Sequence, residues 1–169
     1  MRPTSERARE ALFNILAHGR FGERPIYEDA RVLDVFAGTG AFGLEALSRG
    51  ARFATFIEGD RDARDALAAN IRTMGEESRT RLLTADATRP PRPDGPYSLA
   101  FLDPPYRSEL AQPALAALAA GGWLAPEALV VVEVAARGPF APPDGFQLLE
   151  ERRYGAGRLV FLRWSPALG

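Results

Sequence analysis

Short apolar runs alternate with amphipathic stretches along most of the chain. The apolar runs predict buried strands, which fall at residues 31–36, 53–57, 81–85, 97–102 and 129–134. Apolar side chains at helical spacing predict helices around them, at residues 5–17, 42–49, 61–74 and 109–120. Two further runs, 146–154 and 158–164, flank Gly155-Ala156-Gly157 and predict a hairpin.

Strand–helix alternation of this kind predicts an α/β fold with a doubly wound, mostly parallel sheet of seven strands. The C-terminal hairpin is expected to add one antiparallel strand at an edge. A chain of 169 residues fits a single domain. Residues 1–30 would supply an N-terminal helix and connecting loop, and residues 31–169 a Rossmann-like core.

Composition narrows the classes of function. The chain has no cysteine and one histidine, so thiolate metal sites and cysteine nucleophiles are excluded and no metal is expected. Net charge −1 and a pI near 5.9 argue against a general nucleic-acid coat protein. No run is long enough to span a membrane, and the charged start lacks a signal-peptide core, so we expect a cytoplasmic protein.

A glycine-rich turn follows the first predicted strand. Gly38-Thr39-Gly40-Ala41-Phe42-Gly43 fits G-x-G-x-x-G between a strand and a helix, and Glu58 follows 20 residues after Gly38, at the end of the next strand. This context predicts a nucleotide-type ligand, with Glu58 accepting hydrogen bonds from ribose hydroxyls. A dinucleotide would place its pyrophosphate at the helix N-terminus. S-adenosylmethionine instead needs a carboxylate near the turn for its ammonium group.

Asp34 supplies such a carboxylate within an apolar strand, although a structural Asp bonded to nearby backbone N–H groups is an alternative. Asp34, Glu58, Asp86 and Asp103 are expected to end or line four successive strands at one edge, with Asp86-Ala87 ending the third strand near an adenine amino group. This row favours the methyl donor over NAD. The predicted cofactor residues are Asp34, Phe36, Ala37, Gly38, Thr39, Gly40, Glu58, Gly59, Asp86, Ala87 and Asp103.

The sequence Asp103-Pro104-Pro105-Tyr106 follows another apolar strand. Ligands bind at the carboxyl ends of strands in open α/β sheets. The prolines keep the backbone extended and leave carbonyl acceptors, while Tyr106 offers a face on which a base can stack. These four candidate catalytic residues suit an exocyclic amine on a planar ring. Asp and Pro are also ordinary turn residues, so a simple strand-ending turn is the alternative.

Four segments carry the resemblance to known methyltransferase families. Asp34-Val35-Phe36-Ala37-Gly38-Thr39-Gly40 is similar to motif I of class I methyltransferases, and Asp103-Pro104-Pro105-Tyr106 to the motif of amino-directed nucleic-acid methyltransferases. The opening Arg2–Asn14 and Gly43–Gly50 resemble the RsmD family. That resemblance implies methylation of guanine N2 in bacterial small-subunit (16S) ribosomal RNA, with S-adenosylmethionine as cofactor. It also places Arg7, Arg9 and Asn14 beside the active site as substrate-binding residues, together with Tyr106.

One departure from the family concerns the N-terminus. Family members carry a basic hairpin before the segment that matches Arg2-Pro3-Thr4, and here only Met1 precedes it. Without this hairpin, strong binding to naked RNA is not expected. The acidic composition hints at ribosomal RNA within a partly assembled subunit as substrate, with free RNA as the open alternative, and a monomer is the default expectation. A DNA N6-adenine or N4-cytosine methyltransferase uses the same amine chemistry, and a non-catalytic NAD-type domain is the alternative from another class.

Overall fold

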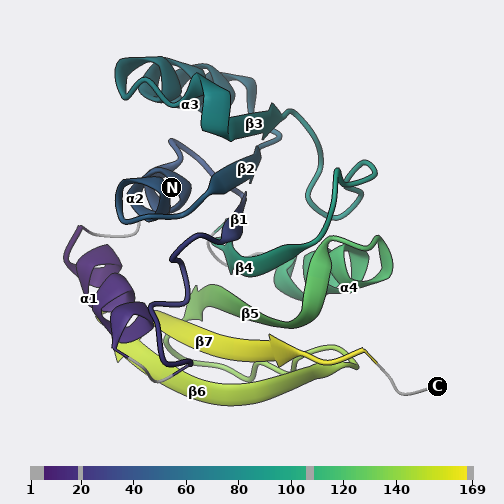
Figure 1. Cartoon of the computed structure of the whole chain (residues 1–169). Helices are drawn as coiled ribbons and strands as arrows, with labels where there is room; N and C mark the ends of the chain where they lie inside the picture. Colours follow the sequence, from purple (N-terminus) through teal and green to yellow (C-terminus); the bar gives the residue numbers. More distant parts are fainter. Residues whose placement is uncertain (1–5, 19–20, 106–108, 167–169) are drawn as a thin grey trace.

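The computed structural model describes residues 6–18, 21–105 and 109–166 (Figure 1). These residues form one seven-stranded sheet in the order β3-β2-β1-β4-β5-β7-β6. Its strands are β1 (Arg31–Val35), β2 (Phe53–Ile57), β3 (Thr80–Leu83), β4 (Tyr97–Leu102), β5 (Leu124–Ala135), β6 (Phe146–Tyr154) and β7 (Gly157–Trp164). The first five strands are parallel, while β7 runs antiparallel to β5 and to β6. The predicted mostly parallel sheet is confirmed.

Helices cover both faces of this sheet (Figure 1). Side chains from α1 (Glu6–Ala17), α2 (Ala41–Ser48) and α3 (Arg61–Thr73) share a core cluster with Val32 of β1. Side chains of α4 (Ala111–Ala120) pack in a second cluster with Leu33, the next residue of the same strand. Successive residues of a strand point to opposite faces, so the uninterrupted apolar runs are explained by burial on both sides.

The C-terminal hairpin corrects one prediction. The antiparallel strand β7 lies between β5 and β6, so it is not at the edge, and the edge strand β6 runs parallel to β5. The four residues Leu159–Leu162 of β7 are almost fully buried, whereas every residue of β6 after the buried Phe146 is exposed or partly buried. The apolar strand therefore takes the interior position, and the polar strand faces water at the sheet edge.

Three element boundaries differ from the prediction by two residues or more. β5 begins at Leu124, five residues before the apolar run, because Pro126 and the left-handed Glu127 (φ 66°) disguise its first part. α4 begins at Ala111 instead of 109. β3 ends at Leu83 and not at residue 85, so Asp86 lies beyond the strand. The predicted start of α1 at residue 5 lies outside the described residues.

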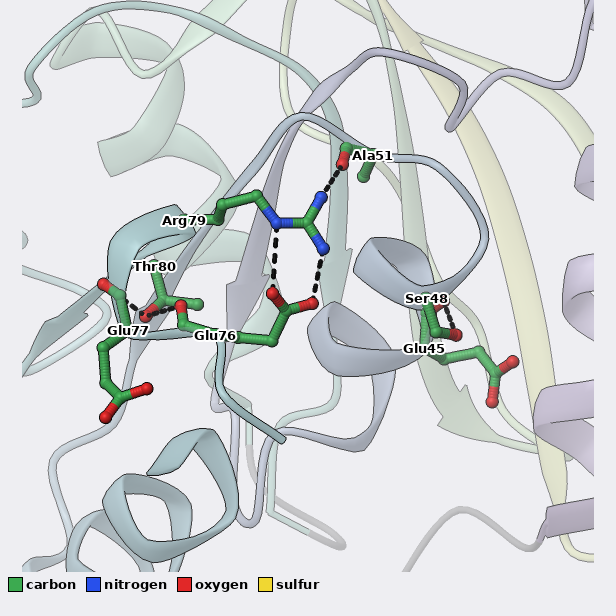
Figure 2. A network of polar contacts seen from close by, with 7 residues as sticks. All are labelled: Glu45, Ser48, Ala51, Glu76, Glu77, Arg79 and Thr80. Carbon is green, nitrogen blue, oxygen red and sulfur yellow. Dashed lines mark hydrogen bonds and ion pairs between the residues drawn. The ribbon is translucent and has the colours of Figure 1, made fainter. Parts of the chain in front are cut away.

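A short 3₁₀ helix, η1 (Glu77–Arg79), which the sequence pattern did not predict, precedes β3. Figure 2 shows Arg79 forked onto the carboxylate of Glu76, with Nε 3.1 Å from Oε1, while Nη1 donates to the carbonyl of Ala51 at 3.0 Å. Ala51 lies just before β2, so this contact ties the start of β3 to the start of its neighbour.

Candidate functional site

The turn between β1 and α2 is shaped by residues with positive φ. Phe36 (φ 57°), Gly38 (φ 58°) and Gly40 (φ 84°) all adopt left-handed conformations. The turn is held by the N–H of Gly40, which donates to the carbonyl of Ala37 at 2.8 Å, and by the N–H of Ala37, which donates to Ile57 at 3.1 Å. A non-glycine residue at positive φ costs free energy, and such strain is concentrated at functional sites.

The glycines of this turn have different roles. A Cβ added to Gly40 would lie 2.2 Å from Cδ1 of Leu67, and one added to Gly43 would lie 2.5 Å from the ring of Phe56. These two glycines allow α2 and α3 to pack closely on the sheet. A Cβ added to Gly38 would meet nothing within 4 Å. Gly38 therefore keeps the outer side of the turn open, as close approach of a ligand to the backbone requires.

Glu58 lies directly beside the turn. Its Oε1 accepts a hydrogen bond from the N–H of Gly38 at 2.7 Å, and its Oε2 accepts one from the N–H of Asp60 at 2.8 Å. A carboxylate has about four acceptor positions, so two neighbouring hydroxyls can still donate to it. Asp60 also caps α3 by accepting from the N–H of Ala63 at 2.9 Å.

Asn70 supports the same turn from α3. Its Nδ2 donates to the carbonyl of Thr39 at 3.0 Å. Reasoning from motifs missed this role, because Asn70 lies 31 residues from Thr39 and only the tertiary fold brings the two together. The signals in the sequence were that Asn70 lies at a helical position and falls within the stretch that resembles the RsmD family.

Asp34 is nearly inaccessible, at 2% exposure, and its Oδ2 accepts the N–H of Gly43 at 3.0 Å. Burial raises the pKa of Asp34 well above its usual value, and the charges of Asp103 and Glu58 raise it further. Asp34 lies in β1, Glu58 directly follows β2 and Asp103 directly follows β4, and β1 pairs with both of these strands. The three carboxylates therefore meet at one sheet edge, and their role as a cofactor site stays a prediction. Three carboxylates whose charges repel one another at one sheet edge favour a cationic ligand.

This arrangement also favours one of the two ligands that the sequence allowed, a dinucleotide or S-adenosylmethionine. A pyrophosphate binds the N–H groups at a helix N-terminus, but Asp34 already occupies the Gly43 N–H in the first turn of α2. The same phosphate would meet the charges of Glu58 and Asp103. An ammonium or sulfonium group fits these surroundings better than a dinucleotide does.

Asp86 lies three residues beyond β3 and not at its end. Its Oδ1 accepts the N–H of Thr88 at 2.8 Å and the Thr88 hydroxyl at 2.7 Å. The hydroxyl bond is the first cause of a lowered pKa for Asp86. A Cβ added to Gly59 would lie 3.2 Å from the carbonyl of Ala85, so the loops after β2 and β3 abut. The side chain of Ala87 is buried, which leaves only its backbone for a ligand.

Asp103 follows β4, and its N–H donates to the carbonyl of Val35 at 3.2 Å. This bond ties the end of β4 to the end of β1. Pro104 is partly buried and Pro105 is exposed. Tyr106, the predicted stacking residue, lies outside the described residues.

The helix α1 packs against α2 beside the turn through an ion pair and an aromatic contact. Arg9 lies 3.6 Å from Glu45, which also accepts from Nε of Arg49 at 2.8 Å. The Phe13 ring stacks on Phe42, which stacks on Phe101 of β4 with ring centroids 4.6 Å apart. Arg9 is thus engaged within the protein. Two other predicted substrate residues, Arg7 and Asn14, lie exposed on α1.

The raised pKa of Asp34 gives a stability prediction. An acid whose pKa is raised in the folded state holds its proton there after the unfolded state has lost it. The free energy of unfolding therefore falls as pH rises from the pKa of the unfolded state towards the pKa of the folded state. Asp34→Asn keeps an acceptor for the N–H of Gly43 and removes this fall in stability with rising pH. We expect it to raise Tm of the ligand-free protein by about 2–6 °C at pH 8, with a smaller gain at pH 5. Calorimetric melting at both pH values measures the difference, and a gain that shrinks as pH rises would contradict it.

Within residues 6–18, 21–105 and 109–166, no helix is long and apolar enough to cross a membrane. In the same part of the chain, no group of three or more His, Cys, Asp or Glu side chains could hold a metal ion.

The family model described as "Conserved hypothetical protein 95" matches residues 1–163. Ribosomal RNA small subunit methyltransferase D of Escherichia coli (strain K12) is 43% identical over 134 residues, covering 79% of this chain but only 64% of that protein. The protein of the same name from Haemophilus influenzae is 35% identical over 159 residues, covering 92% and 79%. A solved structure, "Putative methyltransferase yhhF" from Escherichia coli, is similar at a TM-score of 0.82 and 36% identity, covering 99% of this chain and 89% of that one.

Proposed function

Because the chain belongs to the RsmD family, we propose that it transfers a methyl group from S-adenosylmethionine to the exocyclic N2 amine of a guanine in small-subunit ribosomal RNA. The observation that carries this proposal is the meeting of Asp34, Glu58 and Asp103 at one sheet edge. Two of these carboxylates suit the cofactor, and the third begins the Asp103-Pro104-Pro105 segment that suits an amine.

Each cofactor residue has a distinct role in this proposal. Glu58 accepts from the two ribose hydroxyls while the Gly38 N–H holds its carboxylate in place. Asp34 and the backbone of the turn receive the amino-acid end, whose ammonium group lowers the cost of a buried carboxylate. The segment Asp86-Ala87 borders the adenine, and Gly59 keeps room beside it. Bound S-adenosylmethionine supplies an electrophilic methyl group on its sulfonium.

The acceptor residues act on the amine. Asp103 and the Pro104 carbonyl accept hydrogen bonds from the two N2 hydrogens of a guanine that has been extruded from its stack. These bonds turn the nitrogen lone pair out of conjugation and towards the methyl group. Tyr106 stacks on the base. Transfer is a direct displacement whose rate comes from placement and charge, which suits a chain without cysteine.

The RNA-binding surface includes the exposed face of α1. Arg7 and Asn14 contact RNA there, while Arg9 fixes α1 on α2 through Glu45. We place the activity in the cytoplasm, with a monomeric enzyme acting on ribosomal RNA within a partly assembled subunit. Acidic composition favours that assembly over naked RNA.

The test is radiolabelled methyl transfer to three acceptors: unmodified small-subunit ribosomal RNA, partly assembled small subunits, and DNA. Nucleoside analysis identifies the product. We expect N2-methylguanosine in a ribosomal sample, with the assembled particle as the better acceptor. Label in adenine or cytosine of DNA would overturn the proposal, and so would cofactor binding with no label in any acceptor.

A further inference from the structure

Glu133 is a buried carboxylate with no part in the site described above. Only three polar or charged residues in the described part of the chain are buried: Asp34, Thr55 and Glu133. Asp34 binds the N–H of Gly43, and Thr55 shares a hydrogen bond with the hydroxyl of Tyr97. Glu133 is 6% exposed and directly follows the apolar residues Leu129–Val132 of β5. Because burying a carboxylate is costly, a carboxylate at this depth is placed to make specific polar contacts.

The sheet register places Glu133 beside Asp103. Leu102 of β4 pairs with Val132 of β5, so the next residue of each strand is Asp103 or Glu133. Neighbouring strands lie about 4.8 Å apart. Phe101 and Val131, two residues earlier, belong to the core cluster that includes α1 and α2. Side chains alternate along a strand, so Glu133 lies on that same face of the sheet. Continuing the alternation one residue past the end of β4 places Asp103 on that face too.

The order of strands divides this edge into two halves. Asp34 and Glu58, the proposed cofactor carboxylates, belong to or directly follow β1 and β2. Asp103 directly follows β4 and Glu133 belongs to the neighbouring strand β5, on the other side of β1. A base that receives the methyl group at Asp103 therefore extends towards Glu133.

Guanine presents two adjacent donors on its Watson–Crick edge, the N2 amine and N1–H. A carboxylate is an acceptor only, and its four positions allow it to hold a group of the protein and a base together. Adenine and cytosine place a ring acceptor beside their exocyclic amine, and a carboxylate would repel it. Two adjacent carboxylates therefore match guanine and reject the other amino bases.

We propose that Glu133 is a specificity residue that accepts a hydrogen bond from N1–H of the acceptor guanine, next to Asp103 on the N2 amine. The inference rests on the proposed function and adds the group that selects guanine. Gln at this position would change the preference, because its amide can donate to a ring nitrogen that has no hydrogen.

The test uses 2-aminopurine, which keeps the 2-amine but has an acceptor at N1. It replaces guanine at the nucleotide mapped in the methylation assay, within the same ribosomal particle. We expect the unmodified enzyme to use 2-aminopurine about 100-fold less well than guanine in kcat/KM, the scale of losing one hydrogen bond to a charged group. In Glu133→Gln, kcat/KM for guanine should fall about 10–100-fold and kcat/KM for 2-aminopurine should rise. The affinity for S-adenosylmethionine should stay unchanged.

Glu127→Gln, an exposed position in the same strand, is the matched control and should keep the original preference. Equal use of both bases by the unmodified enzyme, or an unchanged preference in Glu133→Gln, would overturn the inference while leaving the proposed function intact. Glu133→Asp replaces the Gln variant if that one does not fold. It should keep the guanine preference with lower kcat/KM, and unreduced activity would count against the inference. Failure to methylate guanine at all would instead refute the proposed function.

Discussion

Replacing Asp103 by alanine should abolish methyl transfer and leave cofactor binding nearly intact. Asp103 follows β4 and is held by its backbone bond to Val35, so the side chain can be removed without loss of that contact. Without the carboxylate, the N2 lone pair stays in conjugation with the ring. We expect kcat to fall by about 10³-fold or more, the scale of losing one well-placed polar group in a reaction centre. The affinity for S-adenosylmethionine should change by less than about tenfold, because only a neighbouring charge is lost.

Single-turnover transfer and calorimetric titration with S-adenosylmethionine separate these two effects. Asp103→Asn keeps one acceptor oxygen and should retain part of the activity. Asp144→Ala, in the exposed loop between β5 and β6, is the matched control and should behave as the unmodified protein. If Asp103→Ala no longer bound the cofactor, the role assigned to this residue would be wrong.

Replacing Glu58 by glutamine should weaken cofactor binding and leave kcat nearly unchanged, the opposite of what we expect for Asp103→Ala. Both carboxylate oxygens accept from the backbone, at Gly38 and at Asp60. A glutamine amide turns an N–H group towards one of these donors, and it also loses the charge that receives the ribose hydroxyls. Hydrogen bonds to charged groups contribute about 1.5–3 kcal/mol each, so we expect the affinity for S-adenosylmethionine to fall about 100-fold.

Calorimetry gives the change in Kd, and transfer at saturating cofactor gives kcat, which should remain within about fivefold if the acceptor half of the site is intact. Glu77→Gln, on the exposed helix η1, is the control for removing one negative charge. Unchanged cofactor affinity in Glu58→Gln would show that this residue has only a structural role in the turn.

Local patterns in the sequence predicted most elements for a physical reason. The apolar residues 97–102 are buried on both sides, and β4 has these limits. Gly50 follows α2 with φ 116°, as a helix-ending glycine should. Gly38, Gly40 and Glu58 were found from their spacing, because a strand, a turn and the next strand lie close in sequence. The first part of β5 was missed because Pro126 and Glu127 do not have a strand-like pattern.

By itself, the sequence determined the element types, the α/β class, the glycine turn and the carboxylates that follow apolar strands. These follow from periodicity and from short-range backbone chemistry, which each segment carries alone. The tertiary structure decided which strands are neighbours, and with them the interior place of β7, the contact of Asn70 with Thr39, and the position of Glu133 beside Asp103. Strand order depends on how all segments together bury their apolar faces, so no local pattern contains it.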